Sequence, residues 1–320
     1  MLDLTNKKLL ITGGGGFIGS NFIEYVLDNF ENVQIVNIDK LGFGSRDVRS
    51  DLIGKFQNFE FDIRFMNDMY LFDFDLPLIK YDYVFHFAAE SHVDRSIDDP
   101  NSFIANNVLG MCSLLEYCRL AQLQARIMNI STDEVFGHLN LNDPSFTEDS
   151  NLCPRSPYSA SKASADLIAG SYHSTYGMDI ITTRCCNNYG PHQHSEKFIP
   201  TVIRSLKNKE KIPVYGTGEN IREWIHVDDH NKSLLEIAEI GVNGMTYNIG
   251  SGIEKTNLEL INDIIEFGNF GGSIEDHIKF VNDRKGHDFR YAISSLYYNR
   301  GFRMSDYKKS LTETIKFYNK

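Results

Sequence analysis

A run of glycines near the start of the chain restricts its possible folds more than any other feature. Residues Lys8–Thr12 have the apolar composition of a buried strand, and Gly13–Gly19 (GGGGFIG) follow at once and lead into an amphipathic helix. Glycines repeated every three residues allow a tight turn, close approach of the backbone to a pyrophosphate and tight helix packing, and the helix N-terminus attracts the anion. The pattern predicts a dinucleotide site that comprises Gly13, Gly16, Phe17, Ile18 and Gly19.

The first half of the chain alternates short β-rich runs with amphipathic stretches, which indicates right-handed βαβ units and a parallel sheet covered on both faces. We predict an α/β fold with a doubly wound parallel Rossmann sheet and a smaller C-terminal substrate-binding lobe. Residues 1–190 form the predicted Rossmann domain, completed by about 222–250, and residues 191–221 and 251–320 form the predicted lobe. The expected strands are Lys8–Thr12, Val33–Asp39, Tyr83–Ala88, Arg126–Ser131, Ile180–Arg184, Trp224–His226 and Met245–Ile249, and the expected helices include Phe17–Asn29, Asn101–Leu120 and Tyr158–Tyr176.

Composition excludes several classes of protein. No apolar run among the 320 residues approaches the roughly 18 residues that span a bilayer, and the start of the chain lacks a signal-peptide core. A formal charge of −11 disfavours nucleic acid and anionic membranes as partners. The five cysteines show no metal spacing and suit a reducing compartment, and the histidines form no HExxH motif. We therefore expect a cytoplasmic protein without a metal ion.

Several residues are expected to border the cofactor beyond the glycine loop. Asp39 lies 20 residues after Gly19 at the end of the next strand, where a carboxylate can bond a ribose 2′-hydroxyl and repel a 2′-phosphate. This favours NAD over NADP, although Lys40 could bind a phosphate and Asp39 could be an ordinary turn carboxylate. The predicted cofactor residues outside the loop are Asp39, Lys40, Asp62, Ile63, Ala88, Ala89, Tyr158 and Lys162; for Asp62, capping at the strand end is an equal alternative.

A catalytic constellation is predicted from two further segments. Tyr158 and Lys162 are four residues apart and share one face of a helix, so a nearby ammonium and a positive nicotinamide can draw the tyrosine pKa toward neutrality and make it a base. Thr132, Asp133 and Glu134 end an earlier strand, where open α/β sheets bind ligands. Two adjacent carboxyl groups in different surroundings can serve as acid and base, as elimination of water requires. The alternative is a solvated acidic turn.

These segments resemble the extended short-chain dehydrogenase/reductase superfamily and, within it, the nucleotide-sugar 4,6-dehydratases, such as the dTDP-glucose 4,6-dehydratases. The Asp-Glu pair is specific, because epimerase relatives usually lack it. The matching runs cover nearly the whole chain in order: Thr12–Gly19 (TGGGGFIG), His86–Ile97 (HFAAESHVDRSI), Ser131–Gly137 (STDEVFG), Pro157–Ala163 (PYSASKA), Asn187–Pro191 (NNYGP), Glu196–Pro200 (EKFIP), Arg222–Asp229 (REWIHVDD) and Gly286–Ala292 (GHDFRYA).

The resemblance implies an NAD-dependent 4,6-dehydration of dTDP-glucose, UDP-glucose or UDP-N-acetylglucosamine to the 4-keto-6-deoxy sugar. Thr132, Tyr158 and Lys162 would handle oxidation at C4, Asp133 would be the acid at the C6 hydroxyl, and Glu134 would be the base at C5. Alternatives are the same reaction with added C5 epimerisation, a nucleotide-sugar 4-epimerase, and a non-catalytic dinucleotide-sensing protein.

Substrate contacts and assembly are implied in the same way. Asn188, Lys197, Arg222, His287 and Arg290 fall where the family binds sugar, pyrophosphate or base. A buried Arg222 beside Trp224 suits phosphate recognition, or it forms a structural salt bridge; Tyr215 either stacks on a base or packs. Apolar faces on the helices near 101–120 and 158–176 suit a homodimer formed through a helix bundle.

Overall fold

The computed structural model describes residues 2–46, 49–52, 54–71, 80–283 and 286–320. A parallel sheet of seven strands forms its centre, in the order β10-β6-β5-β4-β1-β2-β3. Because the order reverses beside β1, the carboxyl ends of β1 and β4 open a crevice of the kind in which doubly wound sheets bind ligands. The predicted fold class is confirmed. The strands are β1 (Lys8–Thr12), β2 (Gln34–Asp39), β3 (Gln57–Glu60), β4 (Tyr83–His86), β5 (Arg126–Thr132), β6 (Ile180–Cys185) and β10 (Thr246–Ile249).

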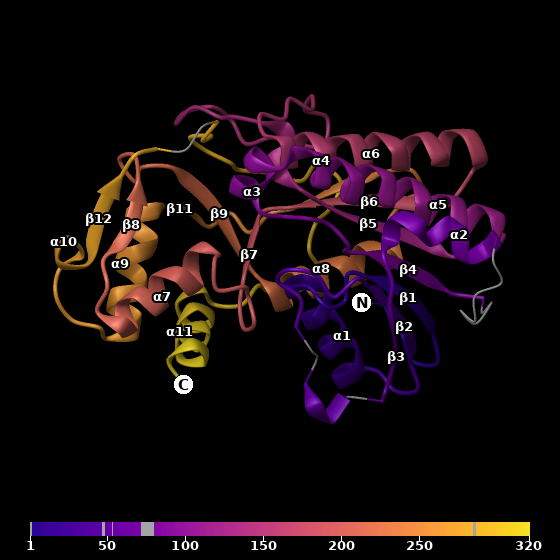
Figure 1. Ribbon diagram of the computed structural model, residues 1–320, viewed down its shortest axis with the longest axis horizontal. Coiled ribbons are helices and arrows are strands. Elements are labelled where there is room, and N and C mark those ends of the chain that lie inside the picture. Colours follow the sequence, from indigo (N-terminus) through magenta and orange to yellow (C-terminus); the bar gives the residue numbers. More distant parts are fainter. Residues whose placement is uncertain (1, 47–48, 53, 72–79, 284–285) are drawn as a thin grey trace.

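Helices cover both faces of this sheet (Figure 1). On one face, α1 (Phe17–Asn29) and α8 (Val227–Ile240) pack together and bury residues such as Phe22 and Leu234 against the sheet. The other face carries α2 (Met66–Leu71), α5 (Gly110–Leu120) and α6 (Pro157–Tyr176), which bury residues such as Leu115. The continuous apolar strands are thus buried from both sides, as a parallel sheet requires.

The predicted helix Asn101–Leu120 is interrupted in the structure. The chain forms α4 (Pro100–Phe103), then a π-helical segment η3 (Ile104–Leu109), and only then α5. Short elements elsewhere are η1 (Ser50–Leu52), η2 (Ile63–Phe65), α3 (Val93–Asp98) and η4 (Asp133–Phe136). A π-helical turn shifts the face that the following side chains occupy, and such turns are frequent at functional sites.

A second group of elements lies beside the main sheet (Figure 1). Strand β9 (Ile221–His226) pairs with β7 (Asn187–Tyr189) and β11 (Glu254–Thr256) in a separate sheet, so only β10 of the two expected later strands joins the main one. A third, parallel pair joins β8 (Ile212–Tyr215) to β12 (Ile278–Val281). Helices α7 (Phe198–Asn208), α9 (Asn257–Gly268), α10 (Ile274–His277) and α11 (Tyr307–Asn319) complete this part.

The second group has its own hydrophobic core, in which Ile203, Trp224, Ile261 and Leu311 are buried. The predicted lobe boundaries at 191–221 and 251–320 stay a prediction. Within the described residues, no helix combines the length and the apolar character needed to cross a membrane.

Candidate active site

The glycine loop is shaped so closely by its neighbours that larger residues do not fit. Gly13 has φ +77°, and a Cβ atom placed on it would lie 2.4 Å from the backbone nitrogen of Ala88. A Cβ on Gly19 would lie 2.4 Å from the carbonyl oxygen of Gly13. The loop therefore presses against the segment after β4 and begins α1 directly, which leaves helix N–H groups available for a diphosphate. This geometry fits a dinucleotide.

Asp39 ends β2 and organises the loop that follows. One carboxylate oxygen accepts a hydrogen bond from the Gly15 N–H at 2.8 Å, and the other accepts one from the Leu41 N–H at 2.8 Å. The side chain is buried, yet a carboxylate has further lone pairs that can accept a ribose hydroxyl. Asp39 is thus fixed beside the glycine loop, as the spacing predicts.

The Lys40 ammonium is already bound by other side chains of the protein. Its ammonium lies 2.7 Å from a carboxylate oxygen of Glu90 and 2.9 Å from the amide oxygen of Asn106. The carboxylate compensates its charge, which weakens the case for a 2′-phosphate at this position.

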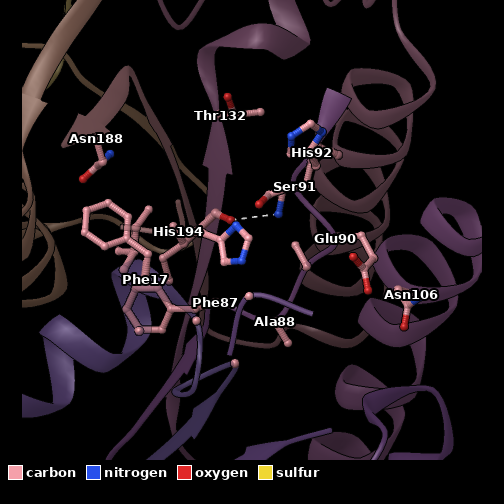
Figure 2. Close-up of a pocket in the computed structure, with 18 of the residues that line it drawn as sticks. Phe17, Phe87, Ala88, Glu90, Ser91, His92, Asn106, Thr132, Asn188 and His194 are labelled. Carbon is pink, nitrogen blue, oxygen red and sulfur yellow. Dashed lines mark hydrogen bonds between the residues drawn. The ribbon is translucent and has the colours of Figure 1, made fainter. Parts of the chain in front are cut away.

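A cavity of about 310 Å³ runs from the glycine loop to the ends of β5 and β6. Figure 2 shows Thr132, Asn188 and His194 around it, with Glu90 and Asn106 on the side opposite Asn188. The cavity therefore unites the predicted cofactor loop and the predicted catalytic residues. Of the predicted site residues, those lining it are Gly13, Gly16, Phe17, Ile18, Gly19, Asp39, Lys40, Ile63, Ala88, Ala89, Thr132, Asp133, Glu134, Tyr158, Lys162, Asn188 and Lys197.

The catalytic candidates come from the end of β5 and the first turns of α6. Thr132 Oγ1 donates to Asp133 Oδ1 at 3.2 Å and accepts from the Glu134 N–H at 3.3 Å, so this hydroxyl caps the short helix that carries both carboxyl groups. On α6, Lys162 Nζ donates to the carbonyl oxygen of Ile130 at 2.8 Å. Tyr158 shares a hydrogen bond with Thr132. The strand and the helix are thereby tied together at the site.

The two adjacent carboxyl residues occupy different surroundings. Asp133 is buried, and burial, followed by the charges of Glu134 and Glu223, raises its pKa well above the ordinary value. Its Oδ2 atom has no hydrogen-bond partner among the described residues. Glu134 is less buried and accepts a hydrogen bond from Ser159 Oγ at 3.3 Å. A protonated Asp133 beside a more accessible Glu134 provides an acid and a base side by side.

The expected lowering of the tyrosine pKa does not arise from the protein's own groups. Burial raises the pKa of Tyr158 well above its ordinary value, and the Glu134 carboxylate raises it further, whereas the Thr132 hydrogen bond opposes this. Burial also lowers the pKa of Lys162, opposed by Asp166. The expected lowering relied on the Lys162 ammonium and a positive nicotinamide, whereas desolvation and the neighbouring carboxylates dominate the Tyr158 pKa within the protein.

Asp62 does not line the cavity. Its carboxylate pairs with Arg64 at 2.6 Å and accepts the Arg64 N–H at 3.0 Å at the start of η2. Burial raises its pKa, but these hydrogen bonds outweigh burial and lower it overall. This is the capping role named as the alternative, while the adjacent Ile63 does face the cavity.

Four predicted substrate residues lie outside the cavity, on β8 and β9 and in the segment after β12. Tyr215 and His287 meet edge to face with ring centroids 6.5 Å apart, and His287 bonds Asp283 at 2.6 Å. The Arg222 guanidinium donates to the backbone carbonyl oxygens of Ile221 and Asp288. It also lies 4.4 Å from the ring centre of Tyr291. Their assignment to substrate stays a prediction.

Arg290 is strongly engaged by the protein itself. Its guanidinium makes two hydrogen bonds to Glu254, at 2.6 and 2.9 Å, and one to the carbonyl oxygen of Asp143 at 2.7 Å. To bind a phosphate, the Arg290 guanidinium would use its remaining N–H groups or give up some of these hydrogen bonds.

Sequence reasoning missed the residues that shape the cofactor side of the cavity. Asn107, in the π-helical segment, is buried and exchanges hydrogen bonds with the backbone of Glu90 at 2.8 and 3.0 Å, and it donates to Ser161 Oγ at 2.8 Å. Its neighbour Asn106 holds Lys40. Two adjacent asparagines between apolar residues of the predicted helix were the available signal, because buried amides require partners.

The sequence signature of the family described as GDP-mannose 4,6 dehydratase matches residues 10–297. The chain belongs to this family. It is 48% identical over 288 residues to the low-salt glycan biosynthesis protein Agl12 of Haloferax volcanii, with 90% of each chain covered. It is 40% identical over 319 residues to a dTDP-glucose 4,6-dehydratase of an Actinoplanes species, with 97% of each covered.

Solved structures agree with this placement. The crystal structure of DesIV, a dTDP-glucose 4,6-dehydratase from Streptomyces venezuelae with NAD bound, superimposes with a TM-score of 0.87 at 37% identity, over 97% of this chain and 96% of that one. The expected class, an NAD-dependent nucleotide-sugar 4,6-dehydratase and hence a hydro-lyase, is confirmed by the family and by these relatives.

Proposed function

We propose that this dehydratase converts a nucleotide-activated hexose to the 4-keto-6-deoxy sugar at the cavity between the glycine loop and α6. The observation that carries the proposal is that Tyr158, Lys162, Thr132, Asp133 and Glu134 share one cavity with the glycine loop. An oxidation–reduction site and a pair of carboxyl groups are both needed for 4,6-dehydration, whereas a 4-epimerase needs only the first.

In this proposal NAD accepts the hydride from C4 of the sugar and returns it to C6. Tyr158 takes the proton of the C4 hydroxyl, held in place by Thr132. Its high pKa in the protein means that a positive charge nearby is needed to stabilise the phenolate, and oxidised nicotinamide supplies one. Lys162, whose ammonium donates to the Ile130 carbonyl oxygen, helps to orient the Tyr158 phenol.

The carboxyl groups act after the ketone has formed. The 4-ketone acidifies the proton on C5, because the resulting negative charge spreads onto the carbonyl oxygen. Glu134 removes that proton and Asp133, protonated because it is buried, donates one to the departing C6 hydroxyl. The low accessibility of Asp133 thus suits an acid that must not ionise at neutral pH.

The substrate is proposed to be dTDP-glucose, UDP-glucose or UDP-N-acetylglucosamine. The names of the relatives support the first. The predicted lobe of residues 191–221 and 251–320 would hold the nucleotide with Tyr215, His287 and Arg290, together with Arg222 of the adjoining segment. A cytoplasmic location is part of the proposal, supported by five cysteines that are all free thiols.

The deciding experiment is turnover against a panel of dTDP-, UDP- and GDP-hexoses, read by the ultraviolet absorbance that the 4-keto product develops in alkali. A 4-keto-6-deoxy product from at least one sugar is expected. Formation of a C4 epimer without that absorbance would replace the proposal with the epimerase alternative, and NAD binding without any conversion would indicate a dinucleotide sensor.

We also propose that the chain forms a homodimer through the helices on the α6 side of the sheet. Ile104 and Leu109 of η3 are 46% and 50% exposed, and Leu167 of α6 is 66% exposed. Segments η3 and α6 pack against each other, so these apolar side chains lie on neighbouring elements. Figure 1 shows α5 and α6 together along one side of the sheet.

A further inference from the structure

Three segments meet at the cavity through side chains to which the proposed reaction assigns no role. The Arg95 guanidinium lies 4.0 Å from the centre of the Phe43 ring. The imidazole of His194 also contacts that ring, with ring centroids 4.6 Å apart. All three residues line the cavity. We call Phe43, Arg95 and His194 the clasp.

The clasp joins segments that are distant in sequence. Phe43 follows β2, Arg95 lies in α3 beyond β4, and His194 lies between β7 and α7. Two further contacts join the last two segments: Lys197 Nζ donates to the Ser91 carbonyl oxygen at 2.8 Å, and His92 lies 3.6 Å from the Glu196 carboxylate. Figure 2 shows His194 and Ser91 next to each other at the centre of the view.

The loop that carries Phe43 is anchored at one end to Asp39 and at the other end to the glycine loop. The Leu41 N–H donates to the Asp39 carboxylate at 2.8 Å, and the Arg46 N–H donates to the Gly15 carbonyl oxygen at 2.7 Å. The clasp is therefore attached to the dinucleotide side of the cavity, although its other members come from elsewhere.

Core packing does not account for this arrangement. Phe43 is 54% exposed, and Arg95 makes no ion pair with any residue that the structure describes. A cation without a carboxylate partner, held on an aromatic face at the edge of an anion-binding cavity, is available to a diphosphate.

We propose that the clasp closes over the diphosphate of the bound dinucleotide and slows its release. The inference rests on the proposed function, in which the hydride taken from C4 returns to C6 within one turnover. Loss of the reduced cofactor between these steps would leave the sugar as a dead-end ketone, so slow release has a direct use. Phe43 and His194 position Arg95, and Arg95 supplies the charge.

The test measures release of NADH from the full-length protein without sugar substrate. NADH fluorescence is followed in a stopped-flow instrument after mixing with excess NAD, for wild type, Phe43→Ala and Arg95→Gln. Release should be about two- to fivefold faster in each variant, the size that a partly exposed cation–π contact supports. The double variant should be less than additive, because both changes break one contact.

Phe65→Ala is the matched control. Phe65 is 49% exposed and has its own arginine, with the Arg64 guanidinium 5.5 Å from the ring centre, but it does not line the cavity. Its NADH release should match wild type, and Phe43→Tyr should restore slow release. Unchanged release in Phe43→Ala, or equal acceleration in Phe65→Ala, would overturn the proposal.

A second arm separates the two diphosphates that could meet Arg95. Binding of dTDP and UDP is measured by calorimetry on the NAD-loaded protein and should be unchanged in Arg95→Gln. Weaker binding of these nucleotides with normal NADH release would assign Arg95 to the sugar nucleotide instead. Because NADH release needs no turnover, the clasp is tested even if no panel sugar yields a 4-keto product.

Discussion

Lys40 and Glu90 form an ion pair of 2.7 Å across the cofactor side of the cavity, although 50 residues separate them in the chain. This pair leads us to expect that Lys40, the residue after Asp39, has little effect on the choice between NAD and NADP. An unpaired lysine here would favour a 2′-phosphate, whereas a lysine already bound to a carboxylate and to Asn106 offers it little.

The first prediction concerns that choice. Wild type should bind NADH more tightly than NADPH in a fluorescence titration, because the Asp39 carboxylate repels the 2′-phosphate. Asp39→Ala should reduce the ratio of the two affinities by about tenfold, and Glu90→Gln should reduce it by less, by freeing Lys40. Tighter binding of NADPH by the wild type would contradict the assignment of Asp39.

The second prediction separates oxidation from dehydration. Tyr158→Phe should lower turnover by about a hundredfold or more, the usual contribution of a general base, and should slow NADH formation to the same extent. Asp133→Asn and Glu134→Gln should still form NADH on rapid mixing with substrate, and NADH should accumulate in at least one of them. If both carboxyl variants lose NADH formation as fully as Tyr158→Phe, the division of roles is wrong.

These side chains also predict a pH effect in the wild type. Removal of the C4 hydroxyl proton needs the Tyr158 phenolate, whose high pKa makes this step faster as pH rises. Dehydration needs protonated Asp133, and although burial raises its pKa, a rise in pH still reduces the protonated fraction. Raising the pH should therefore increase the fraction of enzyme seen as NADH in the steady state.

Local spacing predicted much of the site, because its main parts are each carried by one short segment. The glycine loop sits between β1 and α1, and Tyr158 and Lys162 share a turn of α6. Contacts between segments that are distant in the sequence could not be predicted from local spacing. The contact of Phe43 with Arg95 and the pairing of Lys40 with Glu90 depend on how loops after different strands meet.

The helix near 101–120 illustrates a second limit. Its apolar periodicity predicts a continuous α-helix, but the structure has π-helical backbone over Ile104–Leu109. The π turn accompanies the partners of Asn106 and Asn107, whose buried amides bind Lys40, Glu90 and Ser161. These hydrogen bonds to distant residues offset the energetic cost of the less regular backbone, and the apolar periodicity of the sequence does not predict them.

The third prediction concerns acid stability. His230 of α8 is fully buried, neither ring nitrogen has a hydrogen-bond partner within the described ranges, and burial lowers its pKa to about 3. Above the ordinary pKa of about 6.5 the ring is neutral in both folded and unfolded chains. As pH falls from there toward 3, only the unfolded chain gains the proton, so the free energy of unfolding decreases by about 1.4 kcal/mol per pH unit for this group.

His230→Leu should remove that contribution. Urea unfolding at pH 8, 6 and 5 should show a pH dependence shallower by about one proton than wild type, with stability at pH 8 unchanged or higher because an unpaired buried polar group is removed. His86, whose pKa burial also lowers to about 3, keeps its contribution in both proteins. An identical acid dependence in the variant would show that His230 is not buried as a neutral ring.

The fourth prediction tests the proposed dimer. Leu167→Glu places a charge on the exposed apolar part of α6 and should shift the mass measured by light scattering after size-exclusion chromatography from dimer to monomer. Ile240→Glu is the matched control, since Ile240 is 60% exposed at the end of α8, on the opposite face of the sheet. A monomeric wild type, or equal effects of both changes, would exclude this interface.

The last prediction follows the proton on C5. Glu134 is proposed to remove it, and the 4-keto product keeps that carbon acidic, so turnover in heavy water should place deuterium at C5, detected by proton NMR of the product. Because Glu134 is the base and remains beside the carbon, it is also the expected donor, and reprotonation from the same side preserves the configuration. The Ser159 hydroxyl, 3.3 Å from the Glu134 carboxylate, supports this by holding the group on one side of the site. Ring couplings should therefore report the original configuration, whereas couplings of the inverted sugar would reveal a second donor and the added C5 epimerase activity. A product without deuterium at C5 would mean either that elimination does not pass through C5 deprotonation or that Glu134 returns its own proton unexchanged. Glu134→Gln, which cannot take up the C5 proton, decides between these explanations: dehydration should stop only under the second.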